Sequence, residues 1–148
     1  MRRGKLVFTN GCFDLLHVGH VDLLERCRAL GDSLVVGLNS DASVRALKGP
    51  HKPYVNESER RRLLLALRCV DEVIIFDEPT PLQLIVHLQP HVLVKGGDWP
   101  VDQIVGADEV RARGGEVHSL PLLAGYSSTN LAAQIAAKVS REAWRRAS

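Results

Sequence analysis

The sequence predicts an α/β fold, because short apolar segments alternate with amphipathic segments along the chain. The apolar segments carry almost no polar residues, and residues 33–38 are the clearest example. Such segments are typical of strands that are buried on both faces of a parallel sheet. No internal repeat or linker interrupts the pattern, so we expect a single domain over residues 1–148 with helices on both faces of the sheet.

Local signals place the individual elements. The expected strands cover residues 6–9, 33–38, 72–76, 91–94 and 116–120. The expected helices cover residues 17–30, 42–47, 57–68, 80–88, part of 101–113, and 127–144. Gly31 ends the first helix, residues 39–41 cap the second, and Pro81 lies in the first turn of the fourth. The third helix is amphipathic, the fifth ends at Gly114, and the last begins near Ser127 and closes the domain. Five strands in this alternation indicate a Rossmann-like sheet.

Composition and charge exclude several classes of protein. The chain has 148 residues, 45% of them hydrophobic and 24% charged, and a net charge of +2, which gives no case for nucleic-acid binding. The three cysteines are widely separated and form neither a disulfide framework nor a zinc motif. We expect a cytoplasmic protein without membrane contact, because no signal peptide or apolar run of roughly 20 residues is present.

The most informative stretch is residues 5–20, which joins the first strand to the first helix. A helix N-terminus offers unpaired N–H groups and a positive dipole end, and therefore suits an anion. His17 and His20 lie three residues apart on one helix face, and Gly19 allows close approach to the backbone. The alternatives are partly buried histidines without a ligand, or metal ligands, although a metal site needs a third ligand nearby. We favour phosphate binding.

A second phosphate-binding segment is expected at residues 125–129. Gly125 precedes Tyr126, Ser127, Ser128 and Thr129 at the start of a helix, where hydroxyl and backbone N–H donors occur together. The alternative is an ordinary serine N-cap. The presence of the histidine motif favours the phosphate interpretation.

Topology predicts which loops meet. In an open α/β sheet the ligand lies outside the carboxyl ends of the strands, where the strand order reverses. If the order is 3-2-1-4-5, residues 10–20 face residues 95–99. There Gly97 permits close approach, Asp98 can bind sugar hydroxyls or Mg²⁺, and Trp99 can pack against a ring. The alternative is a Gly-Gly turn with a buried tryptophan.

These motifs resemble the nucleotidylyltransferase superfamily, specifically its cytidylyltransferase-like branch. His-Val-Gly-His after a strand and Gly-Cys-Phe-Asp is similar to the His-x-Gly-His signature of that family. With Val-Lys-Gly-Gly-Asp, Ile-Val-Gly-Ala-Asp-Glu-Val and Gly-Tyr-Ser-Ser-Thr, the chain looks closest to bacterial D-glycero-β-D-manno-heptose 1-phosphate adenylyltransferases in their stand-alone form. Leu122, Leu123 and Ala124 stand where glycerol-3-phosphate cytidylyltransferases have Arg-Thr-Glu, which weakens the case for cytidine.

The resemblance implies roles for individual residues. The catalytic residues would be His17, His20 and Lys48, the last lying in the loop after the second helix; without the resemblance it would be an ordinary surface lysine. The nucleotide-binding residues would be Asn10, Gly11, Cys12, Phe13, Gly19, Gly125, Tyr126, Ser127, Ser128 and Thr129. The substrate-binding residues would be Asp14, Arg60, Lys95, Gly97, Asp98 and Trp99.

The implied reaction transfers AMP from ATP to a heptose 1-phosphate and releases pyrophosphate. The resemblance also implies Mg²⁺, held by the nucleotide and water rather than by protein ligands, and a homodimer. Two alternatives remain open. One is a CTP-dependent enzyme acting on glycerol 3-phosphate or a similar phosphorylated alcohol, and the other is a non-catalytic nucleotide-binding regulatory module.

Overall fold

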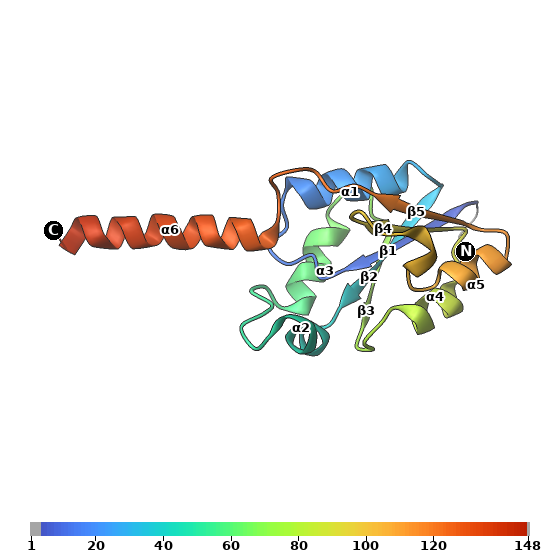
Figure 1. Cartoon of the computed structure of the whole chain (residues 1–148), viewed down its shortest axis with the longest axis horizontal. Helices are drawn as coiled ribbons and strands as arrows, with labels where there is room; N and C mark the ends of the chain where they lie inside the picture. Colours follow the sequence, from blue (N-terminus) through green and yellow to red (C-terminus); the bar gives the residue numbers. More distant parts are fainter. Residues whose placement is uncertain (1–3, 148) are drawn as a thin grey trace.

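The computed structural model describes residues 4–147, and its centre is a five-stranded sheet (Figure 1). The strands are β1 (Leu6–Gly11), β2 (Ser33–Asn39), β3 (Glu72–Phe76), β4 (Val92–Gly96) and β5 (Glu116–Leu120). They lie in the order β3-β2-β1-β4-β5, and each neighbouring pair is parallel. The predicted fold class is confirmed, and the strand order is the one on which the expected meeting of the loops depended. The order reverses between β1 and β4, which is where a ligand crevice is expected.

Helices cover both faces of this sheet. They are α1 (Val18–Arg28), α2 (Asp41–Lys48), α3 (Glu57–Leu65), α4 (Leu82–Leu88), the 3₁₀ turn η1 (Val101–Gln103), α5 (Ala107–Ala112) and α6 (Ser128–Ala147). Val7 and Phe8 follow each other on β1, are fully buried, and belong to different apolar clusters. Because successive side chains of a strand point to opposite faces, the two clusters lie on opposite sides of the sheet.

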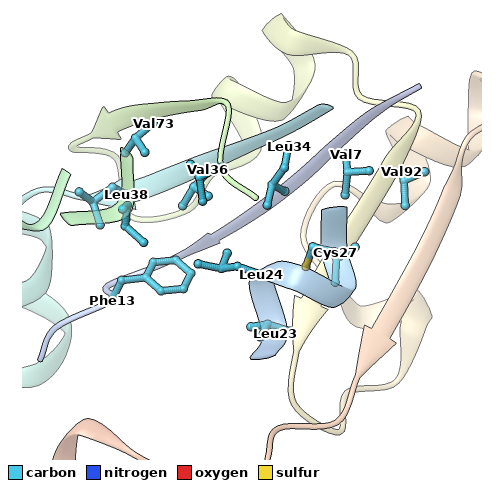
Figure 2. Close-up of a cluster of buried hydrophobic side chains, with 13 residues drawn as sticks. Val7, Phe13, Leu23, Leu24, Cys27, Leu34, Val36, Leu38, Val73 and Val92 are labelled. Carbon is cyan, nitrogen blue, oxygen red and sulfur yellow. The ribbon is translucent and has the colours of Figure 1, made fainter. Parts of the chain in front are cut away.

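The first cluster joins α1 and α3 to one face of the sheet. Figure 2 shows Leu24 and Cys27 of α1 in this cluster with Val7 of β1 and Leu34 of β2. Leu24 and Leu34 are completely buried, and each such side chain stabilises the fold by roughly 2 kcal/mol. This packing fixes the start of α1 relative to the end of β1.

The second cluster joins α4 and α5 to the opposite face. It contains Phe8 of β1 and Leu93 of β4 together with Ile85 and Val110 from the helices. Since Phe8 and Leu93 are paired in the β1–β4 register, both strands present their apolar side chains to this face at the same level. The two faces of the sheet beside the crevice are therefore covered by different helices.

The strands that border the crevice are longer than predicted. β1 extends to Gly11 because Asn10 and Gly11 continue the ladder with β2, and β4 extends to Gly96 because Lys95 and Gly96 pair with β5. Backbone pairing thus carries both strands past their apolar residues. Asn10 and Lys95 consequently sit on the sheet rather than in loops.

The helix caps explain why the neighbouring helices begin where they do. The Ser40 hydroxyl accepts a hydrogen bond from the Ser43 N–H at 3.1 Å, as the sequence predicts for a cap of α2. Asn56 caps α3 in the same way through the Glu59 N–H. α3 ends at Leu65, three residues before its predicted end, in a tight turn that leads to β3.

The last helix differs from its prediction. Figure 1 shows α6 projecting away from the rest of the molecule, and none of its described residues is buried. Ile135 and Val139 are 50% and 61% exposed. The expectation that this helix closes the domain is therefore not met. Among residues 4–147, no helix combines the length and the apolar character that crossing a membrane requires.

Candidate active site

The start of α1 is a capping box built from the two histidines. His17 is the N-cap, and its Nδ1 accepts a hydrogen bond from the Gly19 N–H at 3.0 Å. His20 reaches back, and its Nδ1 accepts from the His17 N–H at 3.2 Å. A ring nitrogen that accepts a hydrogen bond carries no proton, so a neutral ring holds its proton on Nε2. The capping hydrogen bonds therefore leave the proton of each neutral imidazole on Nε2, from which it can be donated.

The environment keeps both rings neutral. The imidazoles of His17 and His20 are stacked, with centroids 3.8 Å apart, and the Phe13 ring meets His20 edge-on. Burial lowers the pKa of His20 to about 4, helped by the nearby positive charges of His17 and Lys48. Burial also lowers the pKa of His17. At neutral pH the pair offers two N–H donors without a net charge.

One of these donors has no partner in the described chain. His17 Nε2 is buried and makes no hydrogen bond with any residue from 4 to 147. A buried polar group is normally satisfied, so an unpaired N–H beside a cavity indicates a place for an acceptor. Gly19 keeps this place open, because a Cβ there would lie 2.8 Å from the His17 ring and 2.9 Å from the Tyr126 Cβ.

The predicted second phosphate segment meets His17 across a cavity of about 330 Å³. The lining residues are His17, Val18, Gly125, Tyr126, Ser127, Asn130, Leu131 and Gln134. The Tyr126 ring lies nearly parallel to His17, with centroids 6.4 Å apart. Gly125 has a φ of +85°, which suits glycine and turns the chain into α6. The structure thus brings residues 125–127 to the start of α1.

The three hydroxyl residues of this segment have different surroundings. Ser127 Oγ accepts from the Asn130 N–H at 3.0 Å, so it caps the first turn of α6. The Ser128 hydroxyl donates to the Asp14 carbonyl and ties α6 to the loop before α1. Thr129 is exposed and does not line the cavity.

Two residues predicted to bind substrate have partners within the chain. The buried Asp14 carboxylate accepts hydrogen bonds from the Tyr54 N–H at 2.7 Å and the Val55 N–H at 3.0 Å. It lies between Phe13 and Leu15, both with positive φ. The carboxylate therefore holds the segment that follows α2 against the β1–α1 loop.

Arg60 is only 1% exposed, although it is charged. Its guanidinium donates to the carbonyls of Cys12, Asn39 and Val55 and pairs with the Asp41 carboxylate at 2.8 Å. The geometry satisfies the buried charge, as burial requires. Arg60 connects the ends of β1 and β2 with the starts of α2 and α3 beneath the crevice.

Lys48 is the last residue of α2 rather than a loop residue. It is exposed, and its positive charge is close enough to His20 to contribute to the lowered pKa of that ring. Lys48 lines neither the cavity at His17 nor the cavity at Trp99, and its role as a phosphate ligand stays a prediction.

Residues 95–99 form the other side of the crevice, as the topology predicted. A cavity of about 170 Å³ is lined by Asn10, Pro81, Lys95, Trp99, Gln103, Ile104 and Val105. Lys95 Nζ lies 5.6 Å from the centroid of the Trp99 ring, which is 51% exposed rather than buried. Gly97 has a φ of +112°, and a Cβ there would meet the indole at 2.9 Å. Asp98 is exposed and does not line this cavity.

The sequence reasoning missed several residues that line or support the two cavities. Gln134 follows Asn130 by one helical turn, so helical spacing from the serine segment would have found it. Ser119 pairs with Lys95 in the strand register, accepts from the Trp99 N–H at 3.0 Å and donates to the Gly97 carbonyl. Gln103 lies in η1, where no motif marked it.

Comparison with known proteins agrees with the geometry. A family model described as cytidylyltransferase-like matches residues 8–133. The bifunctional protein HldE of Syntrophotalea carbinolica is 57% identical over 135 residues, which are 90% of this chain and 28% of that protein. The protein of the same name from Geotalea uraniireducens is 59% identical and covers 90% of this chain. The chain spans little more than a quarter of the length of these curated relatives.

Solved structures share the fold. The lipopolysaccharide core biosynthesis protein from Thermoplasma volcanium matches with a TM-score of 0.67 and 27% identity, over 82% of this chain and 98% of that one. Pantothenate synthetase from Thermus thermophilus matches with a TM-score of 0.52 and 21% identity, over 80% of this chain and 56% of that one. The second likeness concerns the fold alone.

Proposed function

This chain belongs to the cytidylyltransferase-like family, and we propose that it transfers AMP from ATP to D-glycero-β-D-manno-heptose 1-phosphate, giving ADP-heptose and pyrophosphate. The observation that carries the chemistry is the unpaired Nε2–H of His17 at the mouth of a cavity. The heptose acceptor is supported by the similarity to the HldE proteins and to a lipopolysaccharide core biosynthesis protein.

The histidines act on the nucleotide as neutral donors. In the proposed reaction, an oxygen of the sugar 1-phosphate forms a bond to the α-phosphorus of ATP. The bond from that phosphorus to the bridging oxygen breaks, and the electron pair leaves with pyrophosphate. Negative charge accumulates on the oxygens of the crowded phosphorus, where the Nε2–H groups of His17 and His20 stabilise it. Each neutral ring donates from Nε2 while its Nδ1 keeps the backbone hydrogen bond of the capping box.

In this proposal, the β and γ phosphates of ATP lie between Lys48 and the N–H groups at the start of α6. Lys48 neutralises charge on the β and γ phosphates as pyrophosphate leaves. The backbone N–H groups from Gly125 to Thr129 at the start of α6 take the same phosphates from the other side. The β1–α1 segment from Asn10 to Phe13, with Gly19, completes the proposed nucleotide-binding surface.

The acceptor occupies the β4 side of the crevice in this proposal. Lys95 attracts its phosphate, Trp99 packs against the sugar ring, and the Gly97 backbone and Asp98 contact its polar groups. Asp14 and Arg60 serve substrate binding through the segments that they hold, since their hydrogen bonds within residues 4–147 end on the chain itself.

The donor chemistry of the site fits a magnesium ion that the nucleotide brings with it. Within residues 4–147, no group of three His, Cys, Asp or Glu side chains is placed to hold a metal ion. The groups around the larger cavity are mainly N–H and hydroxyl donors. We therefore propose that Mg²⁺ is held by phosphate oxygens and water, where it neutralises phosphate charge.

Two further aspects of the proposal concern the molecule as a whole. We propose a homodimer, supported by the exposed apolar residues Ile135 and Val139, which lie four residues apart on α6. Light scattering after size exclusion tests it: the wild type elutes at twice the chain mass and Val139→Ser shifts toward one chain mass, whereas a monomeric wild type contradicts it.

We propose the cytoplasm as the compartment, because Cys12, Cys27 and Cys69 are free thiols.

The substrates are tested by pyrophosphate release on a grid. ATP, CTP, GTP and UTP are each combined with Mg²⁺ and heptose 1-phosphate, glycerol 3-phosphate or no acceptor. The proposal predicts release only with ATP and heptose 1-phosphate. Release with CTP and glycerol 3-phosphate would assign the chain to the cytidylyltransferase alternative. Nucleotide binding without release for any acceptor contradicts the proposed transfer and agrees with a regulatory module.

A further inference from the structure

The smaller cavity lies on the opposite face of the sheet from the histidines. Asn10 follows Phe8 by two residues on β1, and Lys95 follows Leu93 by two residues on β4. Phe8 and Leu93 belong to the cluster that packs against α4 and α5. Because side chains alternate along a strand, Asn10 and Lys95 face that side as well. Both line the cavity of about 170 Å³ at the end of the sheet.

This placement gives Asn10 a second neighbourhood beside the nucleotide-binding set in which its motif places it. The larger cavity is lined by His17 and the start of α6, and Asn10 is not among its lining residues. Instead, Asn10 shares a cavity with Lys95 and Trp99. The end of β1 therefore serves two sites, one on each face of the sheet.

The polar groups of the smaller cavity have free hydrogen-bonding capacity. Within residues 4–147, the side-chain amides of Asn10 and Gln103 have no hydrogen-bond partner, and the two residues come from separate segments, β1 and η1. An amide offers two donors and an acceptor, which suits a hydroxyl group that both donates and accepts. Ile104, Val105 and the Trp99 ring add apolar surface. Apolar walls with two amides and a lysine match a polyhydroxylated ring that carries a phosphate.

We propose that Asn10 and Gln103 recognise hydroxyl groups of the acceptor sugar and thereby determine acceptor specificity. The inference rests on the proposed function, because it assigns the acceptor side of that same reaction. Lys95 supplies a positive charge and Trp99 supplies a ring surface, and many phosphorylated acceptors can bind to both. The two amides distinguish a sugar from a shorter phosphorylated alcohol, since a site built to hydrogen-bond hydroxyls discriminates against a ligand that lacks them.

The direct test compares Gln103→Leu with Gln83→Leu. Leucine keeps a similar size and removes the amide. Gln83 is an exposed glutamine of α4 that lines neither cavity, so it is a matched control. For Gln103→Leu we expect at least about a tenfold rise in KM for heptose 1-phosphate, with the KM for ATP within about twofold of wild type. Gln83→Leu leaves both constants unchanged.

A second comparison tests specificity itself. The ratio of kcat/KM for heptose 1-phosphate to that for glycerol 3-phosphate should fall about tenfold in Gln103→Leu and in Asn10→Ala. Binding of heptose 1-phosphate without nucleotide, measured by calorimetry, should weaken in the same variants. Circular dichroism melting verifies that each variant is folded.

The outcomes separate the two claims. A wild type that releases no pyrophosphate with ATP and heptose 1-phosphate overturns the proposed function. An active wild type whose KM for heptose 1-phosphate and acceptor ratio are unchanged in folded Gln103→Leu overturns the assignment of Gln103. A rise in the KM for ATP alone would place the cavity on the nucleotide side and overturn it too.

Discussion

The two sides of the larger cavity are held in different ways. On one side, the β1–α1 loop is fixed from beneath by the buried Arg60 and Asp14, and the histidines are fixed by a capping box. On the other side, no described residue of α6 is buried, and the Ser128 hydroxyl binds the first turn of this helix to the Asp14 carbonyl. We therefore propose different roles for the two sides of the cavity. In the proposed reaction, we expect the fixed side to orient the reacting phosphate and the projecting side to adapt to the nucleotide.

The largest effect is expected from removing a donor on the fixed side. His17→Ala should lower kcat by about 10³, because it removes a hydrogen bond that forms to developing charge. It should also cost about 1 kcal/mol of unfolding free energy, because it removes the N-cap of α1. Steady-state kinetics and urea unfolding measure the two effects.

His17→Asn separates these two roles. Asparagine is a good N-cap, so stability should return to near the wild-type value while turnover stays low. His87→Asn, on the exposed face of α4, is the matched control and should change neither. Recovery of turnover in His17→Asn would mean that capping alone explains the effect of His17→Ala.

Arg60, which lies beneath the crevice, should contribute more to the free energy of unfolding than any other single charged residue. Arg60→Leu leaves the carbonyls of Cys12, Asn39 and Val55 without their donor, and a loss of about 3 kcal/mol is expected. Urea unfolding gives the loss. Arg62→Leu on the exposed face of the same helix is the control. Equal stability of the two variants would show that Arg60 does not hold the crevice together.

Hydrogen exchange compares the two sides directly. The amides of β1 and α1 should exchange only through large-scale unfolding, whereas those of α6 should exchange within a far shorter time. ATP should slow exchange in the first turn of α6 and leave its last turns unchanged. Uniform protection along α6 without ligand would contradict the contrast between the sides.

The last prediction concerns pH, and its effect appears only in acid. Because the pKa of His20 is about 4 in the folded chain and near 6.5 in an unfolded one, the unfolded chain binds a proton more readily. The free energy of unfolding should therefore fall as pH falls from about 6.5 toward 4, and this contribution should be constant above about 7. Urea titrations of wild type and His20→Asn measure it. A His20 ring that titrates near 6.5 by NMR would contradict the neutral pair.

Much of the crevice could be predicted from sequence, and the failures have physical reasons. Apolar runs and glycine stops predicted the five strands, and helix-connected parallel strands have few possible orders, of which the structure shows one. The histidine spacing gave the face that His17 and His20 share. The face of the sheet on which Asn10 lies could also have been predicted, because strand alternation places Asn10 with Phe8. The sequence analysis considered Asn10 only together with the neighbouring residues of its motif.

Other features depend on tertiary packing that no local pattern carries. Arg60 resembles the exposed arginines that follow it, and only the folded chain places three carbonyls around its guanidinium. The partners of Asp14 come from a segment 40 residues away. The direction of α6 depends on whether its apolar residues find a surface, and the helical pattern is the same in either case.

The most direct test of the account follows the phosphorus atoms of ATP by NMR. Wild-type protein with Mg²⁺, ATP and heptose 1-phosphate should give a sugar diphosphate with two coupled phosphorus signals and an equal amount of pyrophosphate. His17→Asn should give the same products far more slowly. Inorganic phosphate and ADP in place of these products, or equal rates for the two proteins, would contradict transfer at the α-phosphorus assisted by His17.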